Sequence, residues 1–297
     1  MKKIDDEIQA LLLEHRGDIR SILKDNHRLD LLYALSSQRE LLLEWYDFEP
    51  EAEVLQVGAD YGALTGLFRS SVRAVTVLDE TESALETVRQ RYPGAANIYY
   101  RKDSLAGYAA EACAEGKKYD YVIFAGTLTA PYEKHIHAAK SLLKPDGILI
   151  VALANALGMK YFAGTVEEEN ALTKRQLAEL LCGDKETQSM ADESGTLKFY
   201  YPMPDYKTPV SIYSDAYLPK KGDLTRVTPA YDYPPYHLME QGEKFDTVCE
   251  AGLFDLYANS YLVFWSADPK QLQKDDERIF IKYNKTRREE FQIKTCI

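Results

Sequence analysis

Residues 54–66 read VLQVGADYGALTG, and this stretch decides the fold. The apolar run from Val54 to Val57 has the composition of a buried strand and passes directly into a glycine-rich turn. Gly58 and Gly62 let the backbone turn tightly and approach a ligand at the start of a helix. The glycines repeat as G-x-x-x-G, whereas a dinucleotide fingerprint requires G-x-G-x-x-G, so a nicotinamide-binding loop is disfavoured. The stretch predicts a strand–loop–helix unit, either as a plain structural turn or as the start of a ligand site.

Strand and helix patterns continue to alternate downstream of this stretch. The β-branched runs are 74–78, 97–100, 121–124 and 148–152, and the helical patterns are 62–70, 82–92, 105–115 and 133–143. Because parallel neighbours need a crossover, this order predicts an α/β fold with a doubly wound, mostly parallel, Rossmann-like sheet. A ligand of such a sheet binds at the carboxyl ends of the strands.

Acidic residues follow two of the predicted strands at that edge. Asp79 and Glu80 end the second strand, where paired carboxylate oxygens suit ribose hydroxyls. Asp103 and Ser104 follow the third strand and are placed to meet an adenine edge. Each acid has an alternative interpretation as an ordinary helix cap.

These features together resemble the class I S-adenosylmethionine-dependent methyltransferases. The glycine loop, the two acidic positions, the strand at 119–124 and the segment SLLKPDGILIV at 141–151 carry the resemblance, which covers residues 51–151. It implies S-adenosylmethionine as cofactor and methyl transfer as activity. The cofactor-binding residues that it implies are Gln56, Gly58, Asp60, Tyr61, Gly62, Asp79, Glu80, Asp103, Ser104, Ala125, Gly126 and Thr127.

Two positions depart from the pattern of that family. Members usually carry an acid where this chain has Gln56, and commonly a glycine where it has Asp60. Gln56 lacks the charge that would favour the cofactor's ammonium, and Asp60 adds a side chain to a crowded loop. We therefore expect weaker cofactor binding than in close relatives. The alternative to an enzyme is a non-catalytic S-adenosylmethionine-binding or scaffolding module of the same fold.

Three further stretches resemble one bacterial subgroup of the family. They are LSSQRE at 35–40, LGMKYFAG at 157–164 and FYYPMPDYK at 199–207. Members of that subgroup accompany enzymes of surface-glycan assembly. The resemblance implies a small-molecule or saccharide acceptor, and glycan-assembly enzymes or a further domain as partners.

Methyl transfer to oxygen needs in-line placement of the acceptor and often a general base. By analogy, the candidates for catalytic residues are Asn155, Asp205 and Tyr206. Apolar runs at 197–201 and 261–265 predict two strands, which we expect to be the last two of the sheet. A Tyr- and Pro-rich insert at about 204–257 lies between them and is predicted to cover the strand ends and form the acceptor pocket. Its tyrosines either supply flat faces for a sugar or only pack the insert onto the sheet. They are Tyr206, Tyr213, Tyr217, Tyr231, Tyr233 and Tyr236.

Composition excludes several other classes of protein. The chain has 36 basic and 47 acidic residues and a net charge of -11, which disfavours nucleic acid as a partner. Its four cysteines form no metal-ligand spacing with the five histidines, so no metal is expected. The absence of an apolar run long enough for a signal peptide or a membrane span predicts a cytoplasmic protein without membrane partners.

The helix and strand patterns along the chain predict three segments. Residues 1–48 form an N-terminal helical appendage, in which Ser37 and Glu40 are expected to make a capping box. Residues 49–268 form the methyltransferase domain with its insert. Residues 269–297 form a C-terminal extension that alternates like a β-hairpin and is either a terminal hairpin or the start of another domain.

Overall fold

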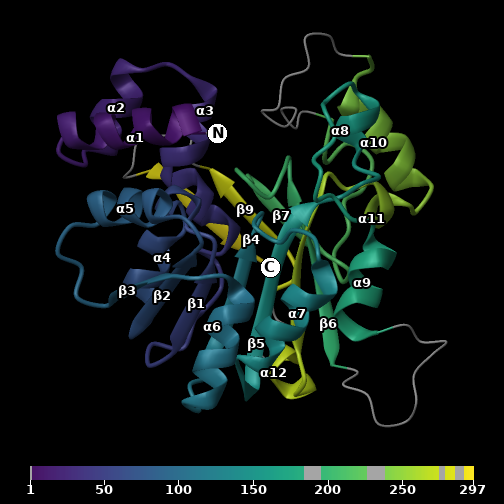
Figure 1. Cartoon of the computed structure of the whole chain (residues 1–297). Coiled ribbons are helices and arrows are strands. Elements are labelled where there is room, and N and C mark those ends of the chain that lie inside the picture. The colour runs from purple at the N-terminus through teal and green to yellow at the C-terminus, as the bar shows by residue number, and fades with distance from the viewer. Residues whose placement is uncertain (1, 184–194, 226–237, 274–277, 285–290) are drawn as a thin grey trace. The chain divides into compact units, whose positions relative to one another are not determined.

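The structure is a computed structural model that describes residues 2–183, 195–225, 238–273, 278–284 and 291–297 (Figure 1). The chain divides into two compact units. The first comprises residues 1–127 and 137–149, and the second comprises residues 128–136 and 150–297. The predicted N-terminal appendage thus belongs to the first unit, and the predicted C-terminal extension belongs to the second.

The first unit begins with short helices, as predicted. They are α1 (Lys2–Glu14), α2 (Ile19–Asp25), α3 (Leu29–Leu35) and the 3₁₀ helix η1 (Ser37–Leu42). Ile8, Leu12, Ile22 and Leu35 are buried together, because apolar residues at helical spacing give each helix one apolar face. The residue that caps η1 is Ser36 and not the predicted Ser37, since the Ser36 hydroxyl accepts from the Gln38 amide at 3.1 Å.

A parallel sheet forms the centre of the first unit. Its strands are β1 (Glu53–Val57), β2 (Ala74–Asp79), β3 (Ile98–Lys102) and β4 (Tyr119–Ala125), in the order β3-β2-β1-β4. The connecting helices are α4 (Thr65–Ser71), α5 (Glu82–Arg91) and α6 (Leu105–Ala114), and α1 packs against α5. The predicted run of alternating strands and helices is confirmed here. The register pairs Val57 with Leu78 and Asp79 with Lys102, so these strands end at one edge.

Two elements run between the units. Helix α7 (Tyr132–Ser141) begins in the second unit and ends in the first. Strand β5 (Leu143–Ala154) begins in the first unit and ends in the second.

The second unit contains antiparallel strands, so the sheet is mixed, and the predicted parallel pairing holds for the strands of the first unit. The order is β8 (Ser260–Ser266), β6 (Thr196–Met203), β7 (Ser211–Ser214), β9 (Ile281–Asn284) and β10 (Ile293–Cys296). Neighbours in this series pair antiparallel. The predicted pairing of the C-terminal alternating segments is confirmed by β9 and β10. Because two strands follow β8, the segment between β6 and β8 does not lie between the last two strands.

That segment is itself folded. It contains β7, α10 (Gln241–Glu250) and α11 (Phe254–Tyr257), and β7 pairs with both β6 and β9. The remaining short helices of this unit are α8 (Met159–Phe162), α9 (Lys174–Cys182) and α12 (Pro269–Gln273). Tyr200, Tyr201, Tyr261 and Phe264 are buried in its core. Within the ranges that the structure describes, no helix is long and apolar enough to cross a membrane.

Candidate cofactor site

The glycine loop predicted from the sequence follows β1 and is hydrogen-bonded to the end of β2. After β1, the Gly58 amide donates to the Leu78 carbonyl oxygen at 2.8 Å, and the Ala59 amide donates to Asp79 Oδ2 at 2.9 Å. The Asp103 amide donates to the Asp79 carbonyl oxygen at 3.1 Å. Asp79 is therefore the residue through which the loop, β2 and the start of α6 are held at the carboxyl edge of the sheet.

The Asp79 carboxylate retains capacity to bind a ligand. Its Oδ1 accepts from the Thr81 amide and hydroxyl, each at 2.9 Å, and its Oδ2 accepts from Ala59. A carboxylate offers about four acceptor positions, so these donors leave room for about one more. Asp79 is partly exposed. The arrangement suits one hydroxyl of a ribose, and a second hydroxyl would have to displace Thr81 or Ala59.

Gly58 and Thr127 bring the end of β4 against the end of β1. Gly58 has φ +87°, and a Cβ atom there would lie 2.5 Å from the Thr127 methyl carbon. The Thr127 hydroxyl donates to the Val57 carbonyl oxygen. Glycine is therefore required at 58 for its backbone conformation and for the approach of Thr127. Ala125 and Gly126, which precede Thr127, are partly exposed at this edge.

The buried Gln56 side chain stabilises the glycine loop through hydrogen bonds to its backbone. Its side-chain amide donates to the carbonyl oxygens of Gly58 at 3.0 Å and Ala59 at 3.1 Å, and its oxygen accepts from the Thr65 hydroxyl at 2.8 Å. Gln56 is 5% exposed, and Thr65 is fully buried. The amide thus serves two carbonyl oxygens that a carboxylate in the same place would repel. The departure from the family pattern at this position has a structural role.

We expect Gln56→Glu to lower the free energy of unfolding by about 1–3 kcal/mol, because two buried carbonyl oxygens lose their donor. Urea unfolding of the unaltered chain and the variant measures this difference. Gln38→Glu, at a partly exposed position of the same unit, is the control and should leave stability unchanged. Equal or higher stability of the Gln56 variant, with tighter cofactor binding, would contradict this role.

Asp60 and Tyr61 follow in a left-handed backbone conformation, with φ 41° and 54°. Arg39 Nη2 donates to Asp60 Oδ2 at 2.6 Å, and the two side chains are 7% and 23% exposed. Gly62 has φ +72°, and its carbonyl oxygen accepts from the Tyr92 hydroxyl at 2.9 Å. Burial raises the pKa of Tyr92, so this hydroxyl remains a donor. The charge that Asp60 adds to the loop is thus neutralised by an arginine of the N-terminal segment.

The residues predicted to contact adenine have intramolecular partners. Ser104 caps α6, since its hydroxyl accepts from the Gly107 amide at 3.1 Å, as the alternative interpretation required. Asp103 Oδ2 accepts from Arg101 Nη2 at 3.3 Å, and Arg101 also pairs with Glu111. Glu80 is exposed. The structure thus places Gly58, Asp79, Asp103 and Thr127 at or just after the ends of the strands in the order β3-β2-β1-β4, and Glu80 and Ser104 follow Asp79 and Asp103 in the chain.

Sequence reasoning missed several residues that shape this site. They are Arg39, Thr65, Thr81, Arg91 and Tyr92, which contact Asp60, Gln56, Asp79, Tyr61 and Gly62. Arg39 lies in the LSSQRE stretch that marked the subgroup resemblance, but its partner is 21 residues away. Thr81, two residues after Asp79, had a readable signal as an Asx turn.

The catalytic candidates belong to the second unit and have structural partners. Asn155 is fully buried, donates to the carbonyl oxygens of Leu256 and Ala258 at 2.7 and 2.8 Å, and accepts from the Leu157 amide at 3.0 Å. Asp205 is 2% exposed, and its Oδ1 accepts from the Lys207 amide at 3.0 Å. These contacts show how both side chains are held, and their catalytic roles stay predictions.

Asp205 and Tyr206 form part of a charged cluster, which we define as Lys160, Glu168, Asp205, Tyr206 and Lys207. Lys160 Nζ is 2.7 Å from Asp205 Oδ2 and 2.8 Å from Glu168 Oε1. Lys207 Nζ donates to Glu168 Oε1 at 3.1 Å, and the Tyr206 hydroxyl donates to Glu168 Oε2 at 3.3 Å. The cluster joins the two stretches 157–164 and 199–207 that the subgroup resemblance singled out.

Charge is balanced inside this cluster. Burial lowers the pKa of Lys160, but the carboxylates of Asp205 and Glu168 outweigh it and hold that pKa above its ordinary value. Burial raises the pKa of Glu168, but Lys160 and Lys207 hold it below its usual range. The Lys160 side chain is fully buried, whereas those of Glu168 and Lys207 are 20% and 21% exposed. Only the Glu168–Lys207 end of the cluster thus reaches solvent.

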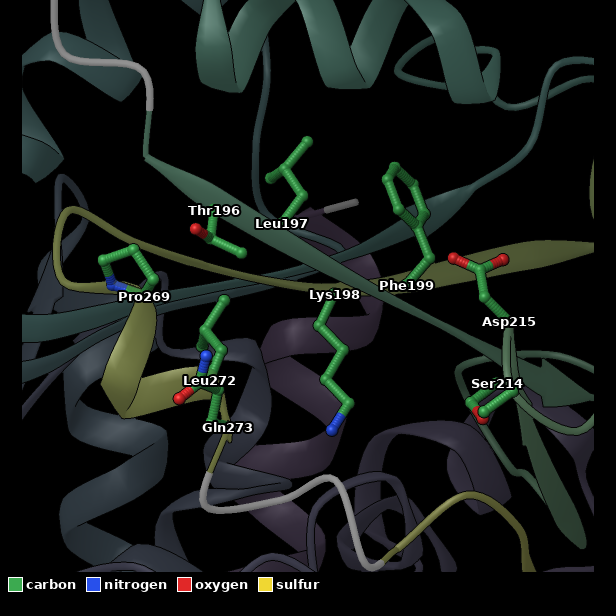
Figure 2. A pocket seen from close by; sticks show the side chains of 10 residues that line it. Thr196, Leu197, Lys198, Phe199, Ser214, Asp215, Pro269, Leu272 and Gln273 are labelled. Atoms are coloured by element: carbon green, nitrogen blue, oxygen red, sulfur yellow. The ribbon is translucent and has the colours of Figure 1, made fainter.

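Figure 2 shows a separate, open pocket of about 320 Å³ in the second unit. Side chains of β6, α12 and the end of β7 line it, among them Lys198, Asp215 and Leu272. None of the individually named candidate residues lies on its wall, although Ser214, Asp215 and Ala216 belong to the predicted insert. In the part of the chain that the structure describes, no group of three or more His, Cys, Asp or Glu side chains is placed to hold a metal ion.

No protein-family model matches the chain, and no curated protein matches it. Among solved structures it is similar to phosphoethanolamine N-methyltransferase 1 of Haemonchus contortus in complex with phosphoethanolamine and S-adenosylhomocysteine. The identity is 13% and the TM-score 0.47, over 88% of this chain and 48% of that chain. For the N-methyltransferase NodS of Bradyrhizobium japonicum, in complex with S-adenosylhomocysteine, the identity is 19% and the TM-score 0.36, over 50% of this chain and 72% of that chain.

A TehB-like methyltransferase of Corynebacterium glutamicum is similar at 11% identity and a TM-score of 0.42, over 77% of this chain and 86% of that chain. All three TM-scores are below 0.5, and all three identities are below 20%.

Proposed function

We propose that the first unit binds a nucleoside-containing cofactor at the carboxyl edge of its parallel sheet. One observation carries this proposal. Asp79, at the end of β2, holds the glycine loop through Ala59 and keeps acceptor capacity for a hydroxyl at the strand ends. Ligands of open parallel sheets bind at this edge, and an acid in this place is suited to a ribose.

We further propose that the cofactor is S-adenosylmethionine and that the chain is a methyltransferase. The residues present fit the cofactor: Asp79 would hold the ribose, and Gly58 and Gly62 keep the loop backbone close to the strand ends. When bound, S-adenosylmethionine supplies a methyl group on a sulfonium centre. The part of this chain would be to orient that group toward an acceptor and to hold both in line.

We propose a small-molecule or saccharide acceptor, and the second unit contains polar groups of the kind that bind one. The Glu168–Lys207 end of the charged cluster offers a carboxylate that accepts from hydroxyls and an ammonium that donates. Because the pKa of Glu168 is lowered, this carboxylate would orient an acceptor hydroxyl more readily than deprotonate it. Glu168 would hold the acceptor hydroxyl by accepting its hydrogen bond, and the hydroxyl proton would pass to solvent when the oxygen is methylated.

The insert offers fewer exposed tyrosine faces for an acceptor than its sequence suggested. Tyr206 and Tyr213 are 3% and 4% exposed, so both pack inside the second unit and offer no face to a ligand. Tyr217 is partly exposed and stacks on Phe280. The other predicted tyrosines, Tyr231, Tyr233 and Tyr236, lie outside the described residues. Deletion of the insert would also remove β7 from between β6 and β9, so point variants are the better test.

Calorimetric titration with S-adenosylmethionine, followed by a transfer assay with a labelled methyl group over hydroxylated acceptors including nucleotide sugars, tests the proposal. We expect binding and transfer to at least one acceptor, and we expect Glu168→Gln to reduce transfer while cofactor binding is unchanged. Binding without transfer would favour the alternative, a non-catalytic module that acts beside glycan-assembly enzymes. Absence of binding would contradict both functions.

A further inference from the structure

Two consecutive non-glycine residues of the loop between β1 and α4 have left-handed backbone conformations. Asp60 has φ 41°, and Tyr61 has φ 54° and ψ 14°. Residues with a Cβ atom are disfavoured in this region, and they persist only where their surroundings hold them, often at ligand sites. The loop therefore stores strain beside the candidate ribose contact, Asp79.

Each of the two strained residues is held by a buried arginine. Arg39, from η1, donates from Nη2 to Asp60 Oδ2 at 2.6 Å. Arg91, from α5, donates from Nη1 to the Tyr61 carbonyl oxygen at 3.0 Å. Arg39 is 6% and Arg91 9% exposed, so neither contact is much weakened by solvent. Two separate elements thus fix the strained pair.

The same arginines bind the end of the N-terminal helix α3. Arg91 donates to the carbonyl oxygens of Ala34 and Leu35 at 3.1 and 2.9 Å. Arg39 Nη1 donates to that of Tyr33 at 3.4 Å. The last carbonyls of a helix have no donor within the helix, so the arginines satisfy them. The end of α3 and the loop therefore share the same two arginines as hydrogen-bond donors.

We infer that Arg39 is a positioning residue for cofactor binding, an inference that rests on the proposed function. Its ion pair with Asp60 keeps the loop in the left-handed conformation in which Ala59 stays bound to Asp79. The N-terminal segment is thereby part of the cofactor site, acting through the loop. The aspartate in place of glycine is compatible with binding because Arg39 holds it.

The test is the affinity for S-adenosylhomocysteine, measured by calorimetry, of the unaltered chain, Arg39→Met, Asp60→Gly and the double variant. Glycine adopts positive φ without strain, so a chain with glycine at 60 has no need of the ion pair. We expect Arg39→Met to weaken binding about tenfold and the double variant to bind within about threefold of the unaltered chain. Arg28→Met, an exposed arginine of the same segment, is the control and should bind normally.

Two results would overturn the inference. An equal loss in Arg39→Met and in the double variant would show that Arg39 only supports the fold. Tighter binding by Asp60→Gly alone would show that Asp60 occupies Arg39 at the expense of a cofactor carboxylate.

Hydrogen exchange of amides 58–63 without cofactor separates this inference from the proposed function. We expect faster exchange in Arg39→Met, because the strained backbone of Asp60 loses the ion pair that holds it. We expect normal exchange in the double variant, because glycine at position 60 adopts positive φ without strain. Unchanged exchange in Arg39→Met would overturn the role of the ion pair. If exchange is faster in Arg39→Met but the unaltered chain binds no S-adenosylhomocysteine, the proposed function is contradicted, and with it the role of Arg39 in cofactor binding.

Discussion

Replacement of Lys160 by methionine is expected to lower the free energy of unfolding by about 3–5 kcal/mol. The Lys160 side chain is fully buried, and its ammonium neutralises Asp205, which is itself 2% exposed. Removal of the ammonium leaves the Asp205 carboxylate without its ion-pair partner at a site that water does not reach. Chemical denaturation of the two proteins under identical conditions measures the effect.

The double variant Lys160→Met with Asp205→Leu should recover a large part of this loss, because it removes both buried charges together. Lys221→Met is the matched control, since Lys221 pairs with Glu250 on the surface of the same unit and should be replaceable without measurable cost. A Lys160 variant as stable as the Lys221 variant would show that the charged cluster does not stabilise the second unit.

Replacement of Asp79 by alanine should weaken the binding of S-adenosylhomocysteine by about 1.5–3 kcal/mol, the range for loss of charge-assisted hydrogen bonds. This corresponds to an increase in Kd of about 10- to 150-fold. The physical reason is twofold. The ribose would lose its acceptor, and the Ala59 amide would lose the carboxylate that fixes the loop. Calorimetric titration of the folded variant measures the change.

Glu51→Ala is the control for the Asp79 variant. Glu51 is an exposed acid of the same unit that precedes β1, and its replacement changes the net charge by the same amount. It should bind the cofactor as the unaltered chain does. Equal losses at both positions would point to a long-range charge effect, and no loss at Asp79 would remove that residue from the site.

The first unit was predictable from the sequence because its signals are local. Val54 to Val57 followed by a glycine turn predicted the strand and loop that the structure contains, and Asp79 lies at the end of β2 as predicted. The hydrogen bond of Ser104 to Gly107 was also within reach, because a serine before a helical run is an N-cap signal.

Contacts between distant residues were not predictable in this way. The pairing of Arg39 with Asp60 and of Arg91 with Tyr61 depends on where α3 and α5 meet the loop, and no spacing in one sequence reveals it. For the same reason the sequence did not reveal the structural role of Gln56, since its carbonyl partners appear only in the folded loop.

The second unit was harder to predict because its strands have weaker patterns. Strand β7 has only four residues, SIYS, and all four are buried. Its polar and apolar residues therefore do not alternate as they would in a strand with one exposed face. Its neighbours in sequence are rich in proline and tyrosine, which suggested an insert and not a sheet strand. Strands β6 and β8 were predicted from apolar runs, but their antiparallel pairing depends on the connection between them.

The central claim is that Asp79 binds the ribose of S-adenosylmethionine at the carboxyl edge of the parallel sheet. A crystal structure of the chain with S-adenosylhomocysteine tests it most directly. We predict a ribose hydroxyl at hydrogen-bond distance, about 2.5–3.0 Å, from an Asp79 carboxylate oxygen, with the Ala59 contact retained. A nucleoside bound away from this edge, or an Asp79 carboxylate with no ligand contact, would contradict the account.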